Sequence, residues 1–171
     1  MNASVWLFFY LCLTLEKIPF HTSHHRVLFA GCNEDVLVDE YHTLPVSGWE
    51  YKDVITDSFE VLEPGHYHQL SANLRINGDY PYANFHVKMN ITFPDSSSKE
   101  YNVPLQLAEK SGKWIGSGLG DVITFRIPVF HRKFLTQKGK YTVSISQDMR
   151  LESVPNIVSA GLRVEQQEEI F

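Results

Sequence analysis

Residues 84–93 read NFHVKMNITF, and this stretch decides the fold class. Its apolar side chains occupy every second position, at Phe85, Val87, Met89, Ile91 and Phe93, with polar or charged residues between them. Because successive side chains of a β-strand point to opposite faces, the alternation predicts a strand with one face in a core and the other in water.

The sequence on either side of this strand repeats the same pattern. Residues 94–98, PDSSS, have the composition of a turn, and apolar residues alternate again through Glu100–Leu107, so the two strands are predicted to form a β-hairpin. Further strands are predicted at Ser58–Leu62, Gln69–Ile76, Val122–Ile127, Tyr141–Ser146 and Ala160–Val164. We therefore expect an all-β, antiparallel β-sandwich over residues 58–165, immunoglobulin-like or jelly-roll-like, followed by a frayed tail at 166–171.

Composition excludes several protein classes. A length of 171 residues with 43% hydrophobic and 13% aromatic residues indicates one globular domain rather than a disordered chain. The net charge of −5 argues against a protein that tracks nucleic-acid phosphates. Acidic residues are concentrated from Glu34 to Glu63, where Lys52 is the one base, and residues 32–57 are predicted to be an acidic leader.

The N-terminal sequence predicts export and lipidation. Residues 3–15 form an apolar run of 13 residues, which suits a signal-peptide core and is short for a transmembrane helix. A second apolar patch ends in Ala30-Gly31-Cys32, a pattern that resembles the lipobox of bacterial lipoproteins. We predict that residues 1–31 are a signal peptide and that Cys32 carries the lipid. The alternative is that Cys32 is an ordinary small hydrophobic residue.

Large aromatic residues near predicted turns are the main candidates for a binding surface. They are Trp49, Tyr80, Tyr82 and Trp114, with Tyr51 close to the first. At loop tips these rings could anchor a protein or stack on sugars. The alternative is that they plug the ends of the sandwich.

Signals of catalysis or of a cofactor are weak. His66 and His68 share one side of a predicted strand, a spacing compatible with a metal ion, but the third ligand would have to come from elsewhere. The glycine-rich stretch 112–121, GKWIGSGLGD, precedes a predicted strand rather than the helix that a phosphate site needs. Gly116-Ser117-Gly118 lacks the frame of a nucleophile elbow. We therefore expect no enzyme activity and no cofactor.

Four blocks of sequence resemble one known family. They are NGDYPYAN at 77–84, GKWIGSGLGD at 112–121, GKY at 139–141 with Met149-Arg150 after it, and VPN at 154–156 with GLRVE at 161–165. In order and spacing they are similar to the gliding motility lipoprotein GldH family, over roughly residues 41–165.

The resemblance implies a setting for the protein. Members are cell-envelope lipoproteins needed for gliding in some bacteria, and they have no assigned catalytic activity. The expected protein is anchored by lipid on Cys32, on the periplasmic or outer-membrane side, and its expected partners are other envelope proteins of a motility or secretion machine. The alternatives are a glycan- or ligand-binding lipoprotein that uses the loop aromatics and, less favoured, a metal-dependent envelope enzyme.

Overall fold

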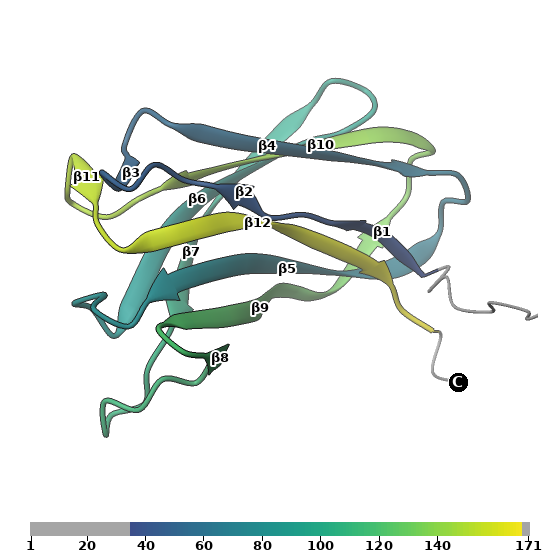
Figure 1. Cartoon of the computed structure of the whole chain (residues 1–171). Coiled ribbons are helices and arrows are strands. Elements are labelled where there is room, and N and C mark those ends of the chain that lie inside the picture. The colour runs from purple at the N-terminus through teal and green to yellow at the C-terminus, as the bar shows by residue number, and fades with distance from the viewer. Residues whose placement is uncertain (1–34, 169–171) are drawn as a thin grey trace, which may run out of the picture. The chain divides into compact units, whose positions relative to one another are not determined.

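The computed structural model describes residues 35–168 of the chain, and this part is built of β-strands with no helix (Figure 1). The strands are β1 (Val36–Asp39), β2 (His42–Thr43), β3 (Trp49–Glu50), β4 (Val54–Val61), β5 (His66–Asn77), β6 (Asn84–Thr92), β7 (Ser98–Gln106), β8 (Ser117–Leu119), β9 (Val122–Leu135), β10 (Gly139–Gln147), β11 (Ser153–Val154) and β12 (Ile157–Gln166). No helix that could cross a membrane occurs within residues 35–168. The predicted signal peptide and Cys32 lie outside the described residues.

Two antiparallel sheets face each other across one core (Figure 1). The first sheet has the strand order β1-β12-β5-β9-β8, with β2 also on β12, and the second has the order β4-β10-β6-β7. The pairing is nested, because β1 pairs with β12, β4 with β10, β5 with β9 and β6 with β7. This nesting is the jelly-roll topology, one of the two sandwich types that the sequence predicts.

Alternating burial confirms the strands that the sequence patterns predict. In β4 and β6 every second side chain is buried, and the buried positions of β6 include Phe85, Val87, Met89 and Ile91. Hydrophobic side chains from both sheets meet in one cluster. Burial of this apolar surface is the main source of stability, at about 25 cal/mol per Å² removed from water.

The sandwich begins earlier in the chain than residue 58. Strands β1, β2 and β3 and the first half of β4 all lie in the range 32–57 that we expected to be an acidic leader. The acidic residues of this range occupy exposed or hydrogen-bonded positions next to β12 and β10. A high content of acidic residues is therefore compatible with strands here and does not indicate a solvated leader. The opposite boundary also differs, because β12 continues to Gln166 and the N–H of Gln167 donates to the carbonyl oxygen of Tyr67 over 2.8 Å.

The connection between β1 and β2 crosses the outer face of β12 at Gly161. A Cβ atom at Gly161 would overlap the carbonyl oxygen of Glu40, so only glycine admits this crossing. Asn73, which lies opposite Gly161 on β5, donates from Nδ2 to Glu40 O over 3.1 Å and to Asp39 Oδ1 over 2.8 Å. The crossing therefore fixes the N-terminal edge of the body to the middle of the first sheet.

Candidate functional site

Trp49 is a core residue rather than a surface residue. Its side chain is fully buried, its ring centroid lies 5.6 Å from that of Phe85, and its Nε1–H donates to the carbonyl oxygen of Asp53 over 2.9 Å. A buried ring cannot contact a partner, so the expectation for Trp49 is corrected. Trp49 closes one end of the sandwich and supports the loops above it.

Tyr80 is buried at the same end. Its hydroxyl donates to the carbonyl oxygen of Asn84 over 3.0 Å, and its ring centroid lies 5.6 Å from that of Tyr82 and 6.4 Å from that of Trp114. Burial raises the pKa of the Tyr80 phenol. Tyr80 is therefore also too buried to contact a partner, which corrects the expectation for it. Tyr82, which packs against Tyr80, is 37% exposed.

Trp114 lies between the surface and the core. Its half-buried ring meets that of Phe125 edge to face, with centroids 6.4 Å apart. Its neighbour Ile115 is half exposed and does not fix the glycine-rich loop to the core. Gly116 and Gly118 of this loop serve close packing, because a Cβ at Gly116 would lie 2.7 Å from the carbonyl oxygen of Thr124 on β9 and one at Gly118 would overlap that of Val122.

Residues 148–152, between β10 and β11, form a ridge at this end of the sandwich. Buried Gln147 holds the ridge from below, since its Oε1 accepts the N–H of Met149 over 2.8 Å and its Nε2 donates to Leu151 O over 2.9 Å. On one side, the N–H of His86 donates to Met149 Sδ over 3.3 Å. On the other, the N–H of Tyr51 donates to the carbonyl oxygen of Glu152 over 2.8 Å.

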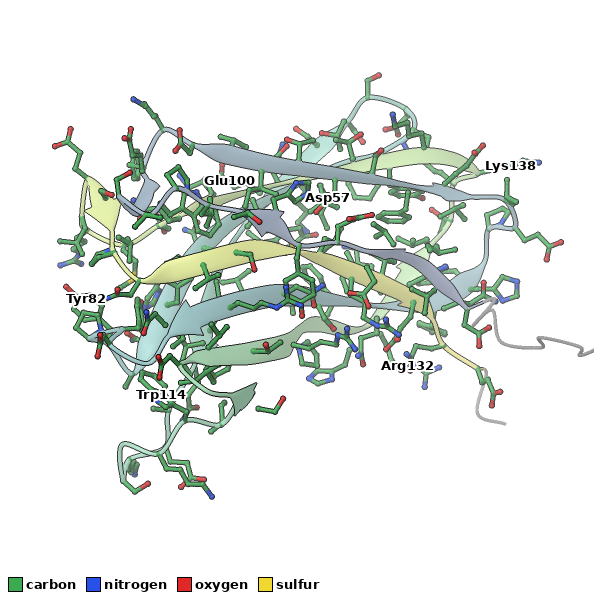
Figure 2. All side chains as sticks on the ribbon, in the orientation of Figure 1. Asp57, Tyr82, Glu100, Trp114, Arg132 and Lys138 are labelled. Atoms are coloured by element: carbon green, nitrogen blue, oxygen red, sulfur yellow. The ribbon has the colours of Figure 1, made fainter. Side chains whose placement is uncertain are left out.

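An open hollow lies on each side of the ridge. The first has a volume of about 450 Å³ and borders β3, and the second, of about 540 Å³, borders β6. Tyr82 marks the second hollow in Figure 2, at the end of the body that carries β3 and β11. We call the ridge with its hollows the ridge surface, and its lining residues are Glu50, Tyr51, Lys52, Tyr82, Asn84, His86, Asp148, Met149, Arg150, Leu151 and Glu152.

Apolar side chains from three separate segments are exposed around the ridge. Tyr51 is 55% exposed, and Tyr82 and Leu151 are each 37% exposed. Protein interfaces are enriched in Tyr, Met and Arg. Met149 and Arg150 line both hollows beside these exposed side chains. The sequence reasoning missed Leu151 as a candidate, because a single leucine beside charged residues carries no local signal.

His66 and His68 both lie on β5 but differ in environment. His68 is buried, its Nδ1 lies 3.1 Å from the carbonyl oxygen of His66, and burial lowers the pKa of its imidazole. No group of three or more His, Cys, Asp or Glu side chains placed to hold a metal ion occurs within residues 35–168. These two histidines are therefore not joined by a third ligand there.

A second polar cluster lies on the outer face of the first sheet. Asp39 Oδ2 accepts from Arg126 Nη2 over 2.8 Å and from Arg163 Nη1 over 2.5 Å, and Arg163 also makes two hydrogen bonds to Glu165. Burial opposes ionisation of Asp39, but hydrogen bonds from Asn73 and Arg163 and the charge of Arg126 outweigh it and lower the carboxyl pKa. These charges satisfy one another, so the cluster is a structural tie between β1, β12 and β9.

Comparison with known proteins identifies relatives of this chain. A family model described as GldH lipoprotein matches residues 36–164, which is the range from the start of β1 into β12. The chain is 28% identical over 149 residues to the gliding motility lipoprotein GldH of Flavobacterium johnsoniae, covering 83% of this chain and 92% of that protein. It is 26% identical over 146 residues to a gliding motility lipoprotein GldH homolog of Christiangramia forsetii, covering 81% of this chain and 89% of that protein.

Proposed function

The chain belongs to the GldH lipoprotein family, and from this premise we propose that it is a lipid-anchored component of a gliding-motility or secretion-associated assembly in the cell envelope. In this proposal Cys32 carries the lipid, and the jelly-roll body binds other envelope proteins without catalysing a reaction. The names of the two relatives support the lipoprotein and gliding parts of the proposal.

The observation that carries the contact role is the ridge surface. Exposed Tyr51, Tyr82 and Leu151 come from three segments far apart in the sequence, with Leu151 on the ridge and the two tyrosines lining its hollows. Anchors of protein interfaces are commonly such aromatic or aliphatic side chains within a polar rim. Here Glu50, Lys52 and the other charged lining residues supply that rim.

The ridge is held in place before any partner arrives. Gln147 bonds to it from below, and the buried side chain of Trp49 fixes the neighbouring strand β3 to the core. A preorganised surface loses little conformational entropy on binding, which favours affinity. This rigidity supports a docking role over a loop that must fold around its ligand.

The anchoring part is tested by intact-mass analysis of the protein extracted from its native membranes. We expect a mature chain that begins at Cys32 and carries acyl groups, and we expect Cys32→Ser to lack them. Acyl groups that persist in the Cys32→Ser variant would contradict the assignment of the lipid to Cys32.

The contact part is tested by photo-crosslinking in intact cells. A photoreactive amino acid at Leu151 should give a discrete adduct with an envelope protein, whereas the same group at Ser58, an exposed position in the middle of β4 and away from the ridge, should not. Tyr82→Ala should weaken capture of that protein on the order of tenfold, since an interface anchor contributes about 1 kcal/mol or more. An adduct with glycan in place of protein would contradict this role and favour the sugar-binding alternative.

A further inference from the structure

We propose that the end of the jelly roll opposite the ridge surface lies against the bilayer, with Leu62 and Phe134 as its membrane contacts. This inference rests on the proposed lipid anchor at Cys32. It adds a second, non-covalent contact with the lipid surface. This contact sets the orientation of the jelly-roll body relative to the membrane.

Chain length brings this end close to the anchor. Three residues separate Cys32 from Val36, where β1 begins, and the four steps between them span at most about 14 Å when extended. A lipid on Cys32 therefore restricts Val36 to the neighbourhood of the headgroups. The far end of β5, where the ridge surface lies, is about 40 Å away by the length of a twelve-residue strand.

The strand pairing places Phe134 at the same end of the first sheet, on its outer face. Asp35 O accepts the N–H of Gln166, the N–H of Gln167 donates to Tyr67 O, and Tyr67 is opposite Phe134 in the sheet. Three strand spacings thus separate Asp35 from Phe134, which is about 14 Å. The turn that carries Leu62 is joined to this row, because Gly65 donates to the carbonyl oxygen of Leu135 over 2.8 Å.

The side chains on this end are those that suit a membrane interface. Leu62 is 64% exposed and Phe134 is 48% exposed, so both present apolar surface to the surroundings. The ring of Tyr67 lies 4.9 Å from that of Phe134, and the guanidinium of Arg132 lies 4.2 Å over the Tyr67 ring. Aromatic rings with an adjacent arginine are favoured at headgroup depth, where the ring enters the apolar region and the cation stays in water.

Charge at this end is mixed rather than strongly positive. Figure 2 shows Arg132 and Lys138 at the end where β1 begins, and exposed Asp35 and Glu63 lie there as well. The contact therefore depends on the apolar side chains, and we expect it on bilayers of phosphatidylethanolamine and phosphatidylglycerol with little sensitivity to salt.

The test uses the full lipidated protein, extracted and reconstituted into vesicles of these two phospholipids. A fluorophore is placed on Lys138→Cys at the proposed membrane end, or on Lys110→Cys in the loop after β7 as the matched control. In the processed, acylated protein the introduced cysteine is the thiol available for labelling. Brominated phospholipids should quench the label at 138 and leave the label at 110 unquenched.

A pair of substitutions separates the apolar contact from the tether alone. Leu62→Ser with Phe134→Ser should lower the membrane-docked fraction about tenfold, because two partly exposed apolar side chains no longer leave water. Val46→Ser with Ile115→Ser removes exposed apolar side chains elsewhere and should leave quenching at 138 unchanged.

Equal quenching at 138 and 110 would overturn this inference, as would unchanged quenching at 138 in the Leu62→Ser, Phe134→Ser variant. Quenching at 138 that appears only after envelope proteins are added would also overturn it, in favour of a protein contact. In each case a mass that shows acyl groups on Cys32 leaves the proposed anchor intact. Absence of those groups would instead overturn the anchor and this inference together.

Discussion

His42 Nε2 lies 2.6 Å from Asp57 Oδ1, and this hydrogen bond joins the two sheets at one edge of the sandwich. His42 belongs to β2 on the first sheet, whereas Asp57 points inward from β4 on the second. The side chain of Asp57 is 5% exposed, and its Oδ2 has no protein partner. The carboxylate is therefore held in the sandwich by one imidazole.

Removal of this imidazole should destabilise the fold. We expect His42→Ala to lower the free energy of unfolding by about 1–3 kcal/mol, because it leaves a buried acid unpaired. Adding Asp57→Val to His42→Ala should restore part of the loss, since the unpaired polar group is then gone. Urea unfolding of the single and double variants measures both effects, and a double variant less stable than His42→Ala would contradict the argument.

Tyr80→Ala and Tyr82→Ala should have opposite profiles. Tyr80→Ala removes a buried ring and should cost about 3–5 kcal/mol of stability, whereas Tyr82→Ala should cost less than about 1 kcal/mol. The aromatic pattern alone predicts that both replacements together leave the melting temperature unchanged, and the burial of Tyr80 corrects that prediction. Thermal unfolding of each single variant checks it; similar melting temperatures would show that Tyr80 is not a core residue.

Acid should weaken the fold through His68. Burial lowers the pKa of His68 below its ordinary 6.5, so the unfolded chain binds this proton more readily than the folded protein. The contribution of neutral His68 to the free energy of unfolding is fully present above pH 6.5. It declines as the pH falls through 6.5 toward the pKa of His68 in the folded protein. Replacing His68 with Gln should flatten the dependence of unfolding free energy on pH between about 7.5 and 5.5.

The control for this prediction is His131→Gln, which replaces an exposed imidazole on β9. It should keep the slope of the wild-type protein. The slope, rather than the absolute stability, is the quantity to compare, since His68→Gln also changes packing in the core. A His68→Gln variant with the wild-type slope would assign the acid sensitivity to other groups.

Gly161→Ala should be far more disruptive than Gly78→Ala. The added methyl group at 161 overlaps the backbone of Glu40, and overpacking of this kind costs about 1–3 kcal/mol. At Gly78 the nearest atom to an added Cβ is 3.7 Å away, which is an ordinary contact. Hydrogen exchange should further show that Gly161→Ala exposes the amide of Glu40, which is bonded to Leu162 O in the parent protein. Equal melting temperatures for the two variants would contradict the close crossing.

Local sequence predicts those strands that have one buried face and one solvent-exposed face. β6 and β10 alternate strictly, so their period is visible in the sequence. β1 and β3 are short and gain their stability from β12 and β11, which lie more than a hundred residues away. No local pattern reports such a partner, so residues 36–57 resemble a solvated leader.

The same limit explains the mixed outcome for the aromatic candidates. Tyr80 and Tyr82 sit two residues apart in one turn, and nothing in that turn distinguishes the buried ring from the exposed one. The distinction comes from Phe85 and Trp114, which surround Tyr80 in three dimensions. The ridge surface could likewise not be predicted from local sequence, because it combines β3, β6 and the segment before β11.

The nested order of strands has a consequence for how the protein is made. In the folded body β1 pairs with β12, so the first strand stays without its native partner until the last strand has been synthesised. Such long-range pairing slows folding. The chain loses the entropy of closing a loop of most of its length before the contacts between β1 and β12 stabilise it. Removing β12 should therefore leave an aggregation-prone, half-closed body rather than a smaller stable domain.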